Sequence, residues 1–179
     1  MTWKTKLEIF EHEKNWDAAV KTVEDFILTD PFSVEGHIRI IYLLHNIVVE
    51  ENCTASERGL YAELLKKYFK DSLKLFCENS EYLFFIGKIL HVAEWYFDQD
   101  DTSLAFKMEQ KALEKEPDNI LFQWANALSF GDIKTEQLLA NRIMNGEAEK
   151  VEWLKERGFP GAYILNFLKY SADRPGKDI

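Results

Sequence analysis

The chain has 179 residues, with 31 acidic and 22 basic side chains, a formal net charge of −9 and an isoelectric point near 5.0. This balance argues against nucleic acid as a direct ligand, because contacts to phosphates need a basic surface. Hydrophobic residues make up 46% of the chain, but it has only eight glycines and four prolines. So few turn-forming residues argue against a fold of many short strands.

Cysteine usage and hydropathy predict a cytoplasmic protein. Cys53 and Cys77 are isolated and lack a CxxC spacing, as expected of structural cysteines in a reducing compartment. The first residues are charged and periodic, unlike a secretory signal. The most apolar run, residues 38–49, is interrupted by His45 and Asn46. It falls short of the roughly 20 apolar residues that cross a membrane, so we expect no membrane contact.

The first half of the chain predicts four helices. A short one contains Leu7 and Phe10, and Asn15 can cap a second over residues 16–28. Asp30-Pro31 ends that helix, because the residue before proline avoids the α region. Ser33 starts a third helix, whose narrow polar stripe predicts burial on most sides. Residues 56–78 form a long amphipathic pattern with one apolar stripe.

The second half predicts five or six further helices. Residues 81–97 are apolar nearly all round, which places that helix centrally, and residues 98–101 form an acidic turn. Further helices are predicted over residues 102–116, 119–130, 135–144, 147–157 and 161–170, with Pro160 at the start of the last. Residues 171–179 show no periodicity. We therefore predict one all-α domain of nine or ten helices over residues 1–170 and a disordered tail over residues 171–179.

One helix pair, at residues 86–119, has small and aromatic residues at regular places. Ala93, Tyr96, Ala105, Ala112 and Pro117 stand at the signature spacings of the tetratricopeptide repeat, which the pair resembles. The resemblance implies that Ala93 and Ala105 let two antiparallel helices approach closely. It also implies that Tyr96 fills the wedge beside them and that Pro117 ends the second helix.

The rest of the chain repeats this pattern poorly. Residues 1–33 place Trp3, Phe10, Ala19 and Pro31 at corresponding positions, and Ala127 begins a third copy that lacks its closing proline. The distance between Pro31 and Pro117 is not a whole number of repeats. We predict an irregular tetratricopeptide-like array of antiparallel helix pairs, with a compact irregular helical domain as the alternative.

Motifs for catalysis are missing from the sequence. It contains no GxxxxGK[ST], GxGxxG, GxSxG or HExxH pattern. His91 and Glu94 are three residues apart and could share a metal in a helical bundle, but no second Glu-x-x-His accompanies them. We therefore expect no enzyme activity, cofactor or metal.

Negative charge is concentrated between residues 78 and 118, a segment that contains ten acidic residues and only four lysines. Acidic and aromatic residues alternate there, an arrangement suited to a basic protein surface. The predicted partner-binding residues are Glu94, Trp95, Phe97, Asp98, Asp100 and Asp101. The alternative interpretation places the aromatic residues in the core and the acids in a solvated turn.

Two protein-binding functions compete. A small, acidic, cytoplasmic and non-catalytic chain resembles in overall character the immunity proteins of bacterial contact-dependent growth inhibition systems. That resemblance implies occlusion of the cationic active site of a basic toxin, with a nuclease as the expected kind of toxin. The alternative is a tetratricopeptide-type adaptor or chaperone that binds a peptide segment of its partner. A third possibility, an enzyme with an unfamiliar helical site, would need a metal or a buried pair of acids.

Overall fold

A computed structural model of the protein describes residues 1–174, and in that range it contains ten α-helices, one short 3₁₀ helix and no strand. This confirms the predicted all-α fold. The elements are α1 (Trp3–His12), α2 (Trp16–Thr29), α3 (Val34–Glu50), α4 (Ala55–Phe76), α5 (Ser80–Leu90), η1 (Glu94–Phe97), α6 (Ser103–Lys115), α7 (Ile120–Ser129), α8 (Ile133–Gly146), α9 (Ala148–Glu156) and α10 (Phe159–Asp173).

Polar side chains start the helices where the sequence places them. Asn15, Ser33 and Asn79 each accept a hydrogen bond from a backbone N–H in the first turn of α2, α3 and α5. Thr54 and Glu57 form a reciprocal capping box at the start of α4. Such caps satisfy N–H groups that have no partner inside the helix, which explains why the starts predicted at Asn15 and Ser33 are confirmed. The cap at Thr54 places the start of α4 at Ala55, one residue before the predicted helix at 56–78.

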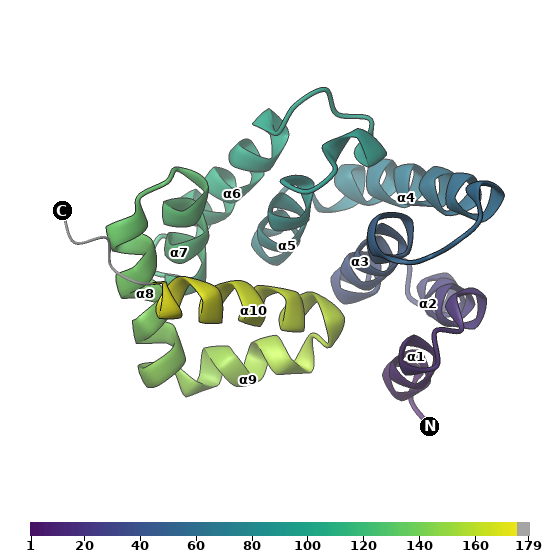
Figure 1. The fold of residues 1–179 in the computed structure, drawn as a ribbon, viewed down its shortest axis with the longest axis horizontal. Coiled ribbons are helices and arrows are strands. Elements are labelled where there is room, and N and C mark those ends of the chain that lie inside the picture. The colour runs from purple at the N-terminus through teal and green to yellow at the C-terminus, as the bar shows by residue number, and fades with distance from the viewer. Residues whose placement is uncertain (175–179) are drawn as a thin grey trace.

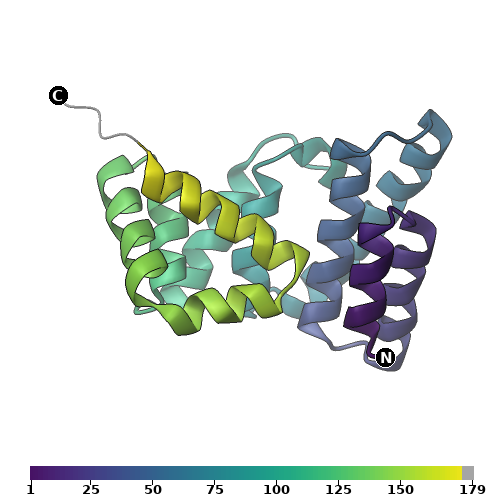
Figure 2. The same cartoon turned by 60° about the horizontal axis from the view of Figure 1, so that its bottom comes forward.

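Consecutive helices pack against each other, and α5 packs most extensively against α6. Helices α1–α4 lie at one end of the molecule and α6–α9 at the other, with α5 between them (Figure 1). Helices α3 and α5 are buried on nearly all sides and hold much of the core. The last helix, α10, packs on α8 and α9 and also reaches α3, so it runs beside the centre of the molecule (Figure 2).

A buried arginine ties the end of α9 to the centre. Arg39 of α3 is only 2% exposed, and its Nη2 donates to the backbone carbonyl of Glu156 at 3.1 Å and to Oε1 of Glu35 at 3.3 Å. Its Nε and Nη1 are buried and find no hydrogen-bond partner among residues 1–174. Arg157 adds a second tie, since its Nε donates to Oε1 of Glu81 at 2.6 Å. These contacts hold the turn that begins α10 beside α3 and α5.

The helix predicted over residues 81–97 is too long, because residues 91–97 do not belong to α5. Helix α5 ends at Leu90, and Ala93 takes a left-handed conformation with φ +55°. The close approach to α6 occurs at Gly87, where an added Cβ would lie 2.8 Å from Cγ of Glu109 and 3.3 Å from the carbonyl oxygen of Ala105. Gly87 rather than Ala93 therefore faces Ala105.

The predicted C-terminal tail begins too early. Helix α10 continues to Asp173, and Ser171 is 1% exposed. Its hydroxyl donates to Oε1 of Glu136 at 2.6 Å, a tertiary contact that the local pattern does not reveal. Residues 175–179 of the predicted tail lie outside the described residues.

Candidate functional site

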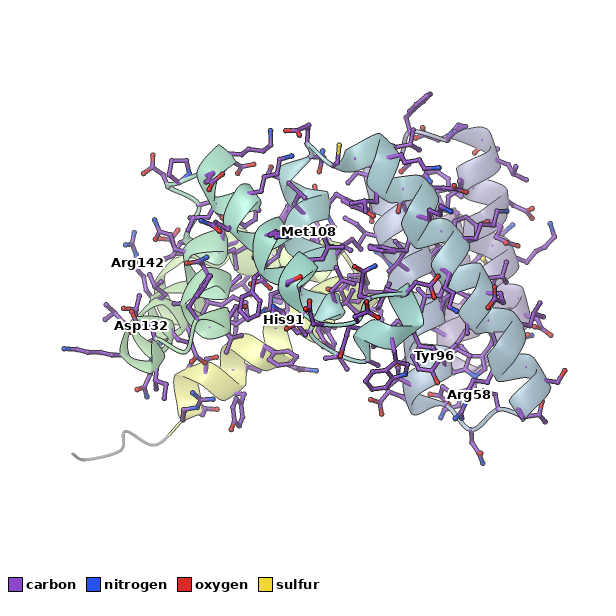
Figure 3. The ribbon with its side chains drawn as sticks, turned by 90° about the horizontal axis from the view of Figure 1, so that it is seen from above. Arg58, His91, Tyr96, Met108, Asp132 and Arg142 are labelled. Carbon is purple, nitrogen blue, oxygen red and sulfur yellow. The ribbon has the colours of Figure 1, made fainter. Side chains whose placement is uncertain are left out.

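The predicted binding segment is a short 3₁₀ turn held between two left-handed residues. Ala93 and Asp98 both have φ near +55°, and η1 lies between them. This conformation costs a residue with a Cβ about 1 kcal/mol or more. Tertiary contacts must hold the segment, and Figure 3 shows Tyr96 next to Arg58 at the start of α4.

The two aromatic residues predicted to contact a partner have opposite environments. Trp95 is 62% exposed, whereas Phe97 is 2% exposed. The Phe97 ring stacks on His45, with centroids 5.7 Å apart, and meets Phe69 edge-on at 5.2 Å. Phe97 therefore belongs to the core, and its predicted role as a contact residue is wrong. It fixes η1 while Trp95 points outward.

The acidic residues of the segment also differ from one another. Asp98 forms an ion pair with Lys66 at 3.0 Å. Asp101 accepts from the backbone N–H of Ser103 at 2.8 Å, and hydrogen bonding to Ser103 holds the pKa of Asp101 below its usual range. Glu94 and Asp100 form no ion pair with any residue from 1 to 174. Together with Asp101, whose hydrogen-bond partner Ser103 is neutral, these two carboxylates carry unbalanced negative charge in the segment that contains Trp95.

A buried polar cluster, which the sequence did not reveal as a unit, lies where α5, α6 and α7 meet. Nζ of Lys88 is 3.3 Å from Oε1 of Glu109 and donates to Oγ of Ser129 at 3.2 Å. Nε2 of His91 lies 3.1 Å from Oε1 of Glu109, and the Ser129 hydroxyl donates to the same carboxylate. Burial lowers the pKa of Lys88. One feature of the sequence could have indicated this cluster. Glu109 is a charged residue on the apolar face of α6 that Ala105, Met108 and Ala112 form.

This cluster resembles a serine–histidine–acid group in composition but not in geometry. In such a triad the two nitrogens of the imidazole contact the serine and the acid separately. Here Ser129 Oγ, at 3.3 Å, and Glu109 Oε1 both approach Nε2 of His91. The carboxylate therefore cannot orient the imidazole through Nδ1 while Nε2 takes the proton of Ser129, as a triad requires. The cluster is a hydrogen-bonded ion pair, and no group of three metal-ligating side chains occurs within residues 1–174.

Two adjoining cavities lie between α10 and the central helices. One has a volume of about 330 Å³ and the other about 390 Å³, and Val92, Tyr163 and Phe167 line both. The first is completed by Lys88, His91, Leu128 and Ser129, and the second by His45, Asn46, Glu50, Ile89 and Phe159. The sequence did not predict them, because their lining comes from four helices that are distant along the chain.

No family model, curated protein or solved structure matches this chain. Among residues 1–174, no helix is long and apolar enough to span a membrane. The exposed segment around Trp95 and the cavities beside α10 are the two candidate binding surfaces.

Proposed function

We propose that this chain binds another protein without catalysing a reaction and that Trp95 anchors the contact. The exposure of Trp95 is the observation that carries the proposal, since 62% of this large side chain remains in solvent. Tryptophan is among the residues that contribute most binding energy at protein interfaces. Burial of this ring by a partner would remove a large apolar surface from water.

The backbone around Trp95 favours binding because it is already ordered. Phe97 is packed between His45 and Phe69, and Asp98 is paired with Lys66. A segment held in this way loses little conformational entropy when a partner docks. Left-handed residues stand at both ends of η1, and the first of them, Ala93, separates it from α5, which ends at Leu90.

Charge favours a basic partner. Glu94 and Asp100 flank Trp95, and the whole chain carries a net charge of −9. Complementary charge accelerates encounter and excludes acidic partners. We favour a bacterial immunity or antitoxin-type role, in which this acidic surface occludes the cationic active site of a toxin such as a nuclease. A tetratricopeptide-type adaptor is the second candidate, and the two adjoining cavities beside α10 favour it because side chains of a bound peptide could enter them.

To test this proposal, the purified chain is first used to capture a partner from the native host. The partner is then produced separately, and its affinity for the chain is measured. We expect nanomolar affinity that weakens as salt concentration rises. Trp95→Ala should weaken binding about thirtyfold, as for an interface hot spot. Phe130→Ala is the matched control, because Phe130 is 61% exposed on a different helix pair. If Trp95→Ala binds the partner as tightly as wild type, Trp95 is not the anchor of the contact. If short peptides from the partner compete for binding, the adaptor function is favoured over the immunity function.

A further inference from the structure

The larger of the two cavities beside α10 combines aromatic rings with a carboxylate. Phe159, Tyr163 and Phe167 line it from α10, and Glu50 lines it from the last residue of α3. Aromatic rings attract cations through their negative faces, and a carboxylate adds Coulomb attraction. We propose that this cavity binds an alkylammonium group. The proposal is independent of the Trp95 contact, because it concerns different side chains and a different kind of surface.

The charges around the cavity leave Glu50 unbalanced. Glu50 is exposed and forms no ion pair within residues 1–174. Lys88, in the adjoining cavity, is already paired with Glu109 at 3.3 Å. The field of Glu50 reaches the aromatic wall, since burial and then this carboxylate raise the pKa of Tyr163 to about 12. A cation in the cavity would meet a net negative lining.

The histidines nearby do not oppose a cation. His45 lies 2.9 Å from the carbonyl oxygen of Val92 through its Nε2, which must carry a proton to donate there. Burial lowers the pKa of His45, so its ring is neutral at neutral pH. His91 faces the Glu109 carboxylate in the adjoining cavity at 3.1 Å. Neither ring places an uncompensated positive charge beside Glu50.

Helix orientation adds a smaller contribution of the same sign. The C-terminal ends of α3 and α5 reach the cavity with Glu50 and Ile89, and helix C-termini carry partial negative charge. The N-terminus of α10 reaches it with Phe159 and carries the opposite sign. Two helix termini with partial negative charge and one with partial positive charge therefore reach the cavity, and their net effect favours a cation.

The size of the cavity suits a small ligand or one inserted side chain. Its volume of about 390 Å³ lies within the usual range of ligand sites, which is about 300–1,000 Å³. The ammonium could belong to a free amine or to a lysine of a protein partner. Both sources share the chemistry recognised by Glu50 and the three rings.

The test is titration of the purified chain with choline, n-butylammonium and 3,3-dimethylbutan-1-ol, the last being a neutral analogue of choline. Calorimetry and amide chemical shifts at constant ionic strength report binding. We expect both ammonium ions to bind at least tenfold more tightly than the alcohol. Glu50→Gln should weaken ammonium binding at least fivefold, and Tyr163→Leu should do the same. Glu13→Gln and Phe130→Leu, an exposed carboxylate and an exposed ring elsewhere, should leave it unchanged.

A second arm separates the two sources of the ammonium. A capped Gly-Lys-Gly peptide is titrated beside the same peptide with norleucine in place of lysine. Binding of the free amines supports a small ligand, whereas Glu50-dependent binding of the lysine peptide alone supports a partner side chain. The proposal fails if the neutral analogues bind equally well, if Glu50→Gln has no effect, or if no ammonium binds. Because Glu50 is exposed, its variant should fold normally, and circular dichroism verifies this even if Tyr163→Leu unfolds.

Discussion

The ammonium group of Lys88 lies 3.3 Å from the carboxylate of Glu109, and both side chains are almost completely withdrawn from solvent. The Ser129 hydroxyl and the His91 ring also contact this carboxylate. A buried ion pair recovers its desolvation cost only when such additional hydrogen bonds satisfy it. The cluster therefore joins α5, α6 and α7 at a site where a single deletion leaves an uncompensated charge.

Glu109→Gln should lower the free energy of unfolding by about 3 kcal/mol at pH 7, because Lys88 would remain buried without its counter-ion. Urea denaturation followed by circular dichroism measures this change. Glu152→Gln is the control, since Glu152 pairs with Lys155 at 2.6 Å on the exposed surface of α9. Surface pairs contribute little, so that variant should behave as wild type. Equal losses in the two variants would contradict the role given to Glu109.

Gly158→Ala should destabilise the chain by about 2 kcal/mol or more. Gly158 has φ +57° and ψ −133°, a conformation almost restricted to glycine. An added Cβ would also lie 2.1 Å from Nη1 of the buried Arg39. The turn into α10 would have to move away from α3.

Gly131→Ala serves as a comparison for Gly158→Ala, because it tests the cost of a left-handed backbone without the clash against Arg39. Gly131 has φ +72°, but its Cβ would meet no atom of the described residues within 4 Å. That variant should lose only about 1 kcal/mol, the cost of a left-handed residue with a side chain. Thermal unfolding of both variants gives the comparison, and similar losses would mean that Arg39 yields easily.

Ala93→Gly should leave stability unchanged or raise it by about 1 kcal/mol. Ala93 occupies the left-handed region, which glycine enters without steric cost. The same change at Ala105, inside α6 and fully buried, should instead lower stability by about 1 kcal/mol or more. Chemical denaturation of both variants measures the two changes in the free energy of unfolding, which should differ as stated. A loss at Ala93 as large as that at Ala105 would show that its methyl group matters more than its backbone.

Local chemistry explains which parts of the fold could be predicted. The caps at Asn15 and Ser33 depend on residues adjacent in sequence, so the local sequence was sufficient to predict them. The end of α5 was different, because residues 91–97 continue an apolar helical pattern. In the structure, α5 ends at Leu90, and Phe97 packs between His45 and Phe69, both distant along the chain, a contact that the local pattern does not contain.

The same limit applies to the candidate sites. The sequence identified Trp95 as a possible contact but could not separate it from Phe97, because only the path of the backbone exposes one ring and buries the other. The cavity beside α10 depends on Glu50 and Tyr163, which are brought together when Arg39 fixes the end of α9. No periodicity in either segment predicts that meeting.

Glu11 should make stability fall as pH rises through the neutral range. Burial raises the pKa of Glu11 to about 7, despite the opposing effect of Arg39 and with a further increase from Glu8. The folded chain therefore binds this proton more tightly than the unfolded chain between about pH 4.5 and 7. Stabilisation by the neutral carboxyl is present at the lower end of this window and is lost as pH rises through 7.

Glu11→Gln removes this titration and keeps a neutral side chain of the same shape. The free energy of unfolding of the variant minus that of wild type should rise by on the order of 2 kcal/mol from pH 5 to pH 8. The lowered pKa of His45 has the opposite pH dependence, but it is present in both proteins and cancels in the difference. Urea denaturation at several pH values gives the two curves, with the exposed Glu13→Gln as control. Parallel curves for Glu11→Gln and wild type would mean that Glu11 is ionised in the folded chain, with Arg39 outweighing its burial.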